Sequence, residues 1–452
     1  MAMTKSGFLH IVRFVDLEKW SAHDAVFENM DNRFPLVPLS KVLKRVKEPV
    51  VIEDGALYKR ITVRLYGQGV LKRDELPGEE IGTKRQFLAH AGQLIISRID
   101  ARNGAFGIVP SELEGAIVTN DFWLFEVHNA LPEYLMLVLS SEPFQKYWQT
   151  QSSGTTNRQR VAEDSFLASR IALPDIEVQK KLVETYLTSI NRAAASEIRA
   201  QNSIIDINTY LFDELGIIER IVEDVGTIIG FTSFSSLYQW GVDKNTTSFP
   251  YEFKKFPAYS FASRPSWIKS LFRGKSPQYS DESSYIILNQ KCNRTDYIDL
   301  SFAKTVDSNW LRKIDKDCLT KENDILINST GEGTLGRASL ISKENEGLAY
   351  DSHMLLLRVN QAEVDPQLIV DLINSPFGQR QVELYKSAQA TKQTELGVDN
   401  TKRFLFPLPD LPEQKRISAA VEEKKKRIIA LYKESESLRL QAKKDFEAAV
   451  FG

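Results

Sequence analysis

Residues 173–181 read LPDIEVQKK, and residues 408–416 read LPDLPEQKR. Each copy opens a stretch whose apolar residues recur at the three- and four-residue steps of a helix that packs on another helix. The leucine-proline-aspartate start is typical of a helix N-terminus, because the proline keeps the entering chain extended and Asp175 can cap free backbone N–H groups. A motif repeated at domain-sized spacing predicts a duplicated chain in which two domains are each followed by a long helix.

Other short segments repeat in the same order ahead of each opener. They are QLIIS at 93–97 with DILIN at 324–328, GAFG at 104–107 with GTLG at 333–336, and the Pro-Phe pairs at 143–144 and 376–377. Chance matches would scatter along the chain, whereas these keep their order. The ordered set therefore favours duplication.

Composition predicts a folded, soluble protein of more than one domain. At 452 residues the chain exceeds one ordinary core. No apolar run approaches the roughly 18 residues of a membrane helix and the N-terminus lacks a secretory layout, so a cytoplasmic location is expected. The two cysteines, Cys292 and Cys318, are too few for a disulfide framework or a cysteine zinc site. The net charge of −2 argues against a polycation but leaves local basic clusters, such as residues 41–47 and 273–275.

Mixed structure is expected before each opener. β-Branched and aromatic runs bounded by turn residues predict strands at 93–99, 105–109, 122–127, 285–288 and 353–357, and helices are expected at 132–148 and 366–377. We therefore predict an α+β fold with an internal repeat. Its two mixed α/β domains span 1–172 and 231–407, and its helical segments span 173–230, including a linker, and 408–452.

The two helical seams are expected to pack on each other as an antiparallel, coiled-coil-like pair. Each could run for about 35 residues, or about 50 Å, and an exposed seam of that length needs a partner. The domain between the helices can connect the end of one to the start of the other. The alternative is that each seam packs on a helix of another chain. The charge run EEKKKR at 422–427 is expected on the solvated face, where i,i+4 ion pairs are ordinary.

Several short motifs resemble catalytic or cofactor-binding sites, but the residues around them do not support those functions. GEGTLG at 331–336 matches a dinucleotide-binding turn, but a strand pattern follows at 337–341 instead of a helix, so we expect a hairpin turn. Asp410 and Glu413 have nuclease-like spacing to Lys415, yet both carboxylates lie at one helix start and cannot hold Mg²⁺ from separate strands. The five histidines lack metal-ligand spacing. We predict no active site.

Two mixed domains, each followed by leucine-proline-aspartate and a long helix with a Gln-Lys pair, resemble the DNA-specificity subunit of type I restriction-modification systems. The resemblance covers almost the whole chain and rests on residues 173–181, 408–416, 93–107 and 324–336. The first opener departs from the usual pattern, because Ile-Glu-Val precedes its glutamine where the second has Pro-Glu. The resemblance implies that 1–172 and 231–407 are target-recognition domains and that the helices are the conserved segments.

The resemblance also implies what the protein does. It would be a non-catalytic subunit, in the bacterial or archaeal cytoplasm, that binds double-stranded DNA and assembles with two methyltransferase (modification) subunits and with restriction/translocase subunits. S-adenosylmethionine, ATP and Mg²⁺ would be bound by those partners, and this chain would hold no cofactor. Adenine methylation or cleavage would occur only in the complex.

Under this interpretation the two domains share a scaffold but differ in their loops, so they are expected to read an asymmetric, bipartite target with an unread spacer set by the helices. Polar and basic loop residues are the expected contacts to bases and phosphates. They are Arg98, Arg102, Asn103, Asn157, Arg158, Gln159 and Arg160 in the first domain, and Lys291, Asn293, Arg294, Gln389, Thr391, Lys392, Gln393 and Thr394 in the second.

Two other classes of protein compete with this interpretation. One is a two-domain adaptor on a coiled coil that holds other proteins apart, which would show no salt-dependent binding to random duplex DNA. The other is a self-contained restriction-modification enzyme, which the absence of methyltransferase and nuclease motifs disfavours.

Overall fold

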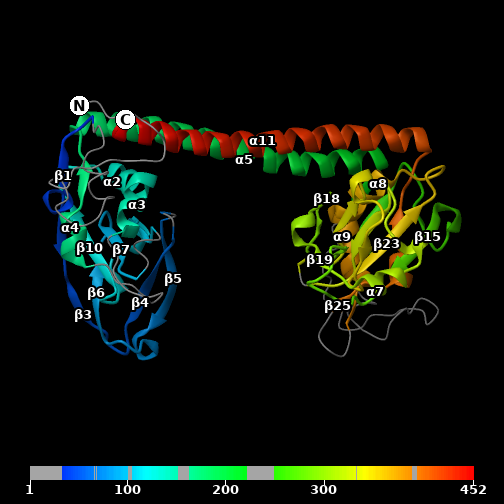
Figure 1. Cartoon of the computed structure of the whole chain (residues 1–452), viewed down its shortest axis with the longest axis horizontal. Coiled ribbons are helices and arrows are strands. Elements are labelled where there is room, and N and C mark those ends of the chain that lie inside the picture. The colour runs from blue at the N-terminus through cyan, green and yellow to red at the C-terminus, as the bar shows by residue number, and fades with distance from the viewer. Residues whose placement is uncertain are drawn as a thin grey trace. The chain divides into compact units, whose positions relative to one another are not determined.

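The structure, a computed structural model, describes residues 33–65, 67, 69–99, 104–150, 162–220, 249–331, 333–388 and 394–452. Contacts divide the chain into two compact units. Unit 1 comprises the residues up to Glu197 together with Tyr432–Gly452, and unit 2 comprises Ile198–Leu431. Each unit therefore combines one sheet-rich domain with one end of each of two long helices, α5 (Ile176–Leu215) and α11 (Leu411–Phe451) (Figure 1).

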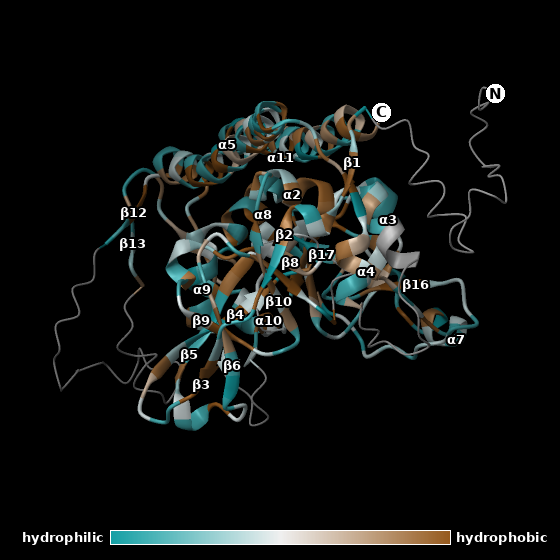
Figure 2. Cartoon of the chain, turned by 90° about the vertical axis from the view of Figure 1, so that its left-hand side faces the viewer, coloured by the Kyte–Doolittle hydropathy of each residue, from teal (hydrophilic) through white to brown (hydrophobic). Residues whose placement is uncertain are grey.

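The two long helices confirm the predicted antiparallel pair. α5 has 40 residues and α11 has 41. In unit 1 the ring of Tyr186, early in α5, lies 6.3 Å from that of Phe446, late in α11. In unit 2 Glu214, late in α5, forms an ion pair with Arg416, early in α11. Hydrophobic and hydrophilic segments alternate along both helices in Figure 2, as expected where one face of each helix is buried.

The central sheet of unit 1 has four strands. Its order is β2 (Leu43–Val46), β10 (Phe122–Val127), β7 (Leu94–Ser97) and β8 (Phe106–Ile108). These strands pack with α2 (Pro132–Ser140) and α3 (Glu142–Thr150), so the predicted single helix is interrupted between them.

The central sheet of unit 2 repeats that order. It consists of β15 (Ile268–Arg273), β23 (Met354–Val359), β20 (Ile325–Asn328) and β21 (Ala338–Leu340). Its two helices are α8 (Pro366–Asn374) and α9 (Pro376–Tyr385). The same strand order, at corresponding places in the sequence, is consistent with the predicted internal repeat.

A second sheet in each unit shows how the copies diverge. In unit 2 it contains β19 (Lys304–Thr305), β16 (Ile286–Leu288) and β22 (Ala349–Tyr350). Unit 1 has an equivalent trio, β5 (Val70–Pro77), β4 (Leu57–Val63) and β9 (Ala116–Val118), with the same parallel pairing of the last two. It adds β6 (Arg85–Ala89) and β3 (Pro49–Val51) beyond β9.

The remaining elements are short. They are β1 (Leu36–Pro38), α4 (Glu163–Ala168), β11 (Arg170–Ala172), β12 (Ile217–Glu219), β13 (Tyr251–Phe253), β14 (Tyr259–Ser260), β17 (Asn293–Arg294), β18 (Tyr297–Ile298), α7 (Ser308–Arg312), β24 (Ser387–Ala388), β25 (Thr394–Glu395), α10 (Val398–Thr401) and β26 (Leu405–Phe406). β1 pairs with β11 in unit 1, and β14 pairs with β26 in unit 2, immediately before each opener. Over the described ranges, no helix has the length and apolarity needed to cross a membrane.

The glycine-rich stretch after β20 is a strand connection, as predicted. β20 and β21 pair antiparallel on either side of it, and no helix follows. Gly336 has a φ of 76°, and a Cβ there would lie 2.3 Å from the side chain of Val382. This glycine therefore permits a turn and a close approach to α9.

Each repeated opener fastens a domain to its long helix through one buried glutamine. In unit 1 the Gln179 side chain accepts from the N–H of Leu131, the residue before α2, and donates to the Pro174 carbonyl, both at 2.8 Å. In unit 2 Gln414 makes the equivalent bonds to Asp365 and Pro409, also at 2.8 Å. We call this arrangement the glutamine clamp. It explains why a glutamine recurs at this position of both openers.

Hydrogen bonds at the paired helices correct one detail of the repeat. The hydroxyl of Ser141 accepts from the N–H three residues on, at the start of α3, and Ser375 does the same for α9. Aligning these serines places Phe144 opposite Gly378. The sequence match between the two Pro-Phe pairs is therefore one residue out of structural register.

The charged run at 422–427 is only partly a solvated face. Lys426 and Arg427 form exposed i,i+4 pairs with the two glutamates, as expected. Lys425 instead points inward, where its ammonium lies 2.6 Å from Asp371 of α8 and 2.7 Å from Asp296 in the β17–β18 turn. The expectation was wrong for this lysine because Asp371 on α8 faces the helix and supplies a buried counter-charge.

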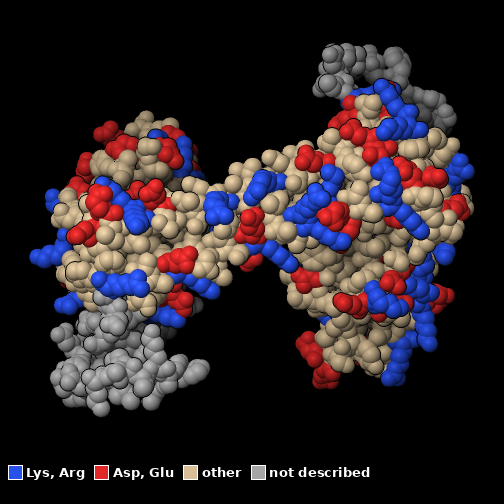
Figure 3. Space-filling view, turned by 90° about the horizontal axis from the view of Figure 1, so that it is seen from above, with Lys and Arg blue, Asp and Glu red and all other residues tan. Residues whose placement is uncertain are grey.

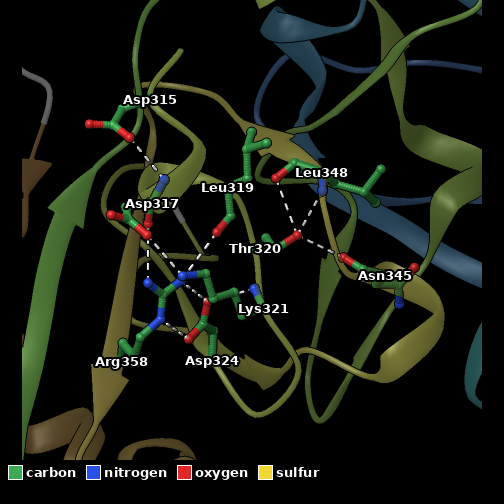
Figure 4. Close-up of polar contacts among 9 residues, drawn as sticks. All are labelled: Asp315, Asp317, Leu319, Thr320, Lys321, Asp324, Asn345, Leu348 and Arg358. Carbon is green, nitrogen blue, oxygen red and sulfur yellow. Dashed lines mark hydrogen bonds and ion pairs between the residues drawn. The ribbon is translucent and has the colours of Figure 1, made fainter.

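One end of the unit 2 sheet is closed by a polar network (Figure 4). The Arg358 guanidinium holds the Asp324 carboxylate through two bonds of 2.8 and 2.7 Å and also donates to the carbonyls of Asp317 and Leu319. The Asp324 side chain is 2% exposed. Because Asp324 precedes β20, this network lies at the start of that strand.

Candidate nucleic-acid interface

The strand ends opposite that network carry the candidate interface. In unit 1 the N–H of Arg98, just after β7, donates to the Asp121 carbonyl just before β10, at 2.8 Å. In unit 2 the N–H of Ser329, just after β20, donates to the His353 carbonyl just before β23, also at 2.8 Å. One backbone arrangement therefore presents different side chains in the two units.

We call these surfaces the β7 edge, formed by Lys47, Arg98, Asn120 and Asp121, and the β20 edge, formed by Arg273, Gln290, Thr330, Ser352 and His353. The two edges also carry a basic residue at equivalent positions. Val46 pairs with Leu124 in unit 1, and Phe272 pairs with Leu356 in unit 2. The residue that follows Val46 is Lys47, and the residue that follows Phe272 is Arg273.

Arg273 is held at the β20 edge by two neighbours. Its guanidinium donates to the Ser352 carbonyl at 3.0 Å and forms an ion pair with Glu395, whose side chain is 9% exposed. Arg273 itself is 43% exposed. A Cβ on the following Gly274 would lie 1.9 Å from the Asp351 carbonyl oxygen, so only glycine permits this approach of the strands.

A small hydrogen-bond network lies beside Arg273. The Thr330 hydroxyl is 2.8 Å from Nδ1 of His353 and 3.3 Å from the side-chain oxygen of Gln290. Asp351 lies beneath, where its carboxylate accepts from the N–H of His353 at 3.0 Å. Burial raises the pKa of Asp351, and this hydrogen bond opposes the rise. The network holds an imidazole and an amide, which can each donate and accept, next to a fixed cation.

The β7 edge presents a different set. The Arg98 guanidinium lies 5.7 Å from the centre of the Trp123 ring and donates to the Asn120 carbonyl at 3.3 Å. Lys47 and Asn120 are exposed, and Asp121 is half-buried. Arg45 next to them is structural, because it donates to the carbonyls of β10 and lies 3.4 Å from Glu163.

Among the expected contacts, five residues fall in the described ranges, and four of them remain candidates. Arg98 lies on the β7 edge, and Lys291 is exposed next to Gln290 of the β20 edge. Arg294 packs its guanidinium 4.3 Å from the centre of the Phe302 ring. Thr394 begins β25, next to the Glu395 partner of Arg273.

Asn293 requires a correction. It is fully buried, and its amide nitrogen donates to Leu326 O, to Asn328 Oδ1 and to Arg337 O at 2.9 to 3.1 Å. Its oxygen accepts from Ser339 at 2.5 Å. These bonds join β17 to the central sheet and occupy the side chain, so we remove Asn293 from the candidate contacts.

The other expected contacts lie outside the described residues. They are Arg102, Asn103, Asn157, Arg158, Gln159, Arg160, Gln389, Thr391, Lys392 and Gln393.

Sequence patterns missed most of the β20 edge. From the sequence, Arg273 was noted only as part of the basic cluster at 273–275. Thr330 precedes the glycine-rich stretch at 331–336 but was not predicted as a contact. His353 and Gln290 had no signal, because only the pairing of β20 with β23 brings them together. A basic residue at the end of the strand before the glycine-rich region, in both halves, is the one pattern that could have indicated Lys47 and Arg273.

Charge on the face seen in Figure 3 is mixed, with basic and acidic side chains interspersed over both units. The described residues contain no cluster of three or more histidine, cysteine or acidic side chains suited to a metal ion. His90 bridges Glu114 at 2.6 Å and Glu48 at 2.9 Å through its two ring nitrogens, and these bonds raise its pKa. It therefore acts as a link between neighbouring strands of the second sheet.

Comparison with known proteins gives a consistent answer. Over 129 residues the chain is 28% identical to the type I restriction enzyme MjaX specificity subunit of Methanocaldococcus jannaschii. That match covers 28% of this chain and 30% of the relative. A chain from a solved structure concerned with complex assembly and conformational transition of the type I R-M system aligns over 93% of this chain and 97% of its own, with a TM-score of 0.59 and 13% identity. This chain is therefore similar in sequence, over part of its length, to a type I specificity subunit, and similar in fold to a chain of a type I R-M system.

Two crystal structures with lower scores align over a similar length. They are the HsdS subunit of Thermoanaerobacter tengcongensis, with 13% identity and a TM-score of 0.43, and the type I restriction-modification S subunit of M. genitalium, with 10% identity and a TM-score of 0.44. Each alignment covers 94% of this chain, but TM-scores at this level add no argument. No protein-family model matches the chain.

Proposed function

We propose that this chain is the DNA-reading specificity subunit of a type I restriction-modification complex, with one half of a bipartite target read by each unit. The matched strand ends carry the proposal. One backbone arrangement joins Arg98 to Asp121 in unit 1 and Ser329 to His353 in unit 2, where the Ser329 side chain is buried and His353 is exposed, so the side chains that face solvent differ. Two readers of the same build with different side chains are suited to an asymmetric target.

The chemistry of the two edges supports contact with duplex DNA. Exposed Lys47 and Lys291 can neutralise phosphates, which position a protein on DNA without reading sequence. Arg273, Gln290 and His353 supply the donors and acceptors that read base edges in the major groove. The other expected contacts remain part of this proposal, namely Arg102, Asn103, Asn157, Arg158, Gln159, Arg160, Arg294, Gln389, Thr391, Lys392, Gln393 and Thr394.

The proposed subunit performs no catalytic step itself. It positions two methyltransferase subunits on the DNA, and translocating nuclease subunits join them for restriction. S-adenosylmethionine, ATP and Mg²⁺ bind to those partners. The competing function is an adaptor on a coiled coil that does not bind DNA.

The decisive experiment is copurification of the chain with a methyltransferase, followed by mapping of methylated adenines on genomic DNA. We expect one asymmetric, two-part sequence with a spacer of constant length. Methylation by the purified chain alone would contradict the non-catalytic role, and a complex that methylates without any sequence preference would contradict the reading role.

Salt dependence of DNA binding separates the reader from the adaptor. We expect affinity for random duplex to fall steeply with salt, and each of Lys47→Ala and Lys291→Ala to reduce the slope of log affinity against log salt by about one, since each removes one phosphate contact. The measurement is fluorescence anisotropy at a series of salt concentrations. Lys433→Ala, an exposed lysine on α11, is the matched control and should leave the slope unchanged. A flat salt response of the unmodified chain would favour the adaptor.

A further inference from the structure

Arg273 is held at the β20 edge so that part of its guanidinium is left for a ligand. Its Nε donates to the Ser352 carbonyl at 3.0 Å, and its Nη1 forms an ion pair with the buried Glu395. A guanidinium has five N–H donors in a planar fork, and within the described residues these two contacts engage two of them. The other three lie on the two terminal nitrogens, which can bond side by side to two adjacent acceptors.

His353 faces outward next to this cation. The residue is exposed, whereas its backbone is fixed, because its N–H donates to the Asp351 carboxylate at 3.0 Å and its carbonyl accepts from the N–H of Ser329 at 2.8 Å. It also directly follows Ser352, whose carbonyl holds Arg273. The imidazole and the guanidinium are therefore presented side by side on one edge.

A chain of two hydrogen bonds fixes which nitrogen of the His353 ring carries the hydrogen. The hydroxyl of Thr330, a residue that is 8% exposed, lies 2.8 Å from Nδ1 of His353 and donates to Oε1 of Gln290 at 3.3 Å. A hydroxyl has one proton, and Oε1 can only accept. Both bonds therefore form together only when Nδ1 carries the hydrogen and donates to Thr330. In the neutral ring this leaves Nε2 as an acceptor.

The edge thus offers adjacent donors from Arg273 and one acceptor from His353. In the major groove a G·C pair presents two adjacent acceptors, N7 and O6 of guanine, and then a donor, N4 of cytosine. An A·T pair presents an acceptor, a donor and an acceptor, so one arginine donor would meet the N6 amino group of adenine. A G·C pair is therefore the complement of this set.

We propose that Arg273 and His353 are specificity-determining residues that read one G·C pair in the half-site bound by unit 2. The guanidinium donates to N7 and O6 of the guanine, and Nε2 of the imidazole accepts from the N4 amino group of the cytosine. Glu395, Thr330 and Gln290 are positioning residues, because they orient the two reading groups. This inference rests on the proposed function and names a base pair that one of its sites reads.

The hydrogen position on His353 is tested first, without DNA. In the full chain labelled with ¹⁵N-histidine, long-range ¹H–¹⁵N spectra at pH 8 distinguish a protonated ring nitrogen from an unprotonated one, and His353→Gln identifies the signal. We expect the hydrogen on Nδ1 in the unmodified chain and in Thr330→Ser, which keeps the hydroxyl. In Thr330→Val we expect it to move to Nε2, the commoner form of a free imidazole. A threonine that only fills space would leave the spectrum of the valine variant unchanged.

Base preference is tested second, on the complex with methyltransferase subunits. Once the methylated target is mapped, each pair of both half-sites is randomised in a plasmid library. The arginine variant is Arg273→Met combined with Glu395→Gln, because removing the arginine alone would leave a buried carboxylate unpaired. Compared with Glu395→Gln alone, we expect the preference for G·C at one pair to fall about fivefold or more, the lower end of what one bidentate base contact contributes. Lys269→Ala, an exposed lysine on β15, is the control.

The imidazole is tested at the same base pair. His353→Leu removes the acceptor, so we expect the preference for G·C to fall there as well. His353→Gln should restore it, because the side-chain oxygen of glutamine reaches the position of Nε2. Thr330→Val should act like His353→Leu, and Thr330→Ser should act like the unmodified chain. The half-site bound by unit 1 is the internal control and should keep its sequence in every variant.

Altered DNA tests the guanine contact at a single atom. In 7-deazaguanine a C–H group replaces N7 and base pairing is kept. We expect a duplex that carries it at the assigned pair to bind the unmodified complex about tenfold less tightly than the normal duplex, since the lost bond is to a charged group. The arginine variant should bind both duplexes equally.

A target with no G·C pair in either half-site would overturn the inference, as would an unchanged preference in the arginine variant or an equal loss with 7-deazaguanine in both proteins. A hydrogen on Nε2 of His353 in the unmodified chain would overturn the assignment of the acceptor. Failure of the proposed function has a different signature. The unmodified complex would then methylate without sequence preference, while the spectra would still report the hydrogen position on His353.

Discussion

Lys425 shows how one residue can join a long helix to a recognition domain. Its ammonium is shared between Asp371, which is 1% exposed, and Asp296, in the turn after Arg294. One oxygen of Asp371 is buried and has no partner. Lys425 therefore connects α11 to the β17–β18 turn through buried charge, and unit 1 contains no such arrangement among its described residues.

The protonation of Asp371 determines how this site responds to pH. Burial raises the pKa of Asp371 to about 6, although the ammonium of Lys425 opposes the rise. A carboxyl whose folded pKa lies above its unfolded value stabilises the fold at low pH. For Asp371 that contribution is present below about pH 4 and is lost as the pH rises to about 6.

Replacing Lys425 by methionine should destabilise unit 2 in a pH-dependent way. At pH 8 the change leaves an ionised, buried Asp371 and should cost about 3–5 kcal/mol of unfolding free energy. At pH 5 the carboxyl takes up a proton and needs no ammonium, so the loss should be clearly smaller. Urea unfolding at the two pH values measures this difference. Lys426→Met, an exposed neighbour, is the control, and an equal loss at both pH values would contradict the mechanism.

At the scale of an element, the glutamine clamps explain the repeated opener. Gln179 and Gln414 are each 1% exposed, and each bonds to a domain helix start and to the proline carbonyl of its own opener. In the second opener Asp410 also accepts from the N–H of Glu413 at 3.3 Å, which is helix capping as the sequence predicted. The opener is thus a joint between a domain and a helix.

Gln414→Leu should loosen that joint. It leaves the N–H of Asp365 and the Pro409 carbonyl buried without their partner, and each such group costs about 1–3 kcal/mol. We expect the midpoint of urea unfolding to fall and hydrogen exchange to increase at the start of α8. Gln441→Leu, an exposed glutamine on the same helix, should change neither. Unaltered exchange at α8 in the Gln414 variant would show that the clamp does not hold the domain.

The elements were predictable wherever the signal is local. Heptad spacing indicated α5 and α11, and the β-branched runs at 94–97, 122–127 and 354–359 became central strands. The break between α2 and α3 was not predicted. The Ser141 hydroxyl donates to the Val138 carbonyl at this point, and the spacing of apolar residues carries no information about such a bond. The extra strands β3 and β6 of unit 1 were missed because the repeat has no counterpart for them.

At the scale of the whole molecule, the two helices are proposed to set the length of the unread spacer. Deleting residues 187–193 of α5 together with 438–444 of α11 removes one heptad from each helix and keeps the phase of the buried face. We expect the methylated site to lose about three base pairs from its spacer, with both half-sites unchanged. Mapping of methylated adenines in cells that carry the variant complex measures this. An altered half-site would contradict the separation of reading from spacing.

The sequence by itself determined the duplication, the two long helices, the hairpin nature of the glycine-rich stretch and the resemblance to specificity subunits. Those features depend on spacing and capping between residues close together in the chain. Only the tertiary structure decided which polar residues face outward. Asn293 is buried and Lys425 is paired, whereas Arg273 and His353 meet at one edge, because strand pairing and helix packing join segments that lie far apart in sequence.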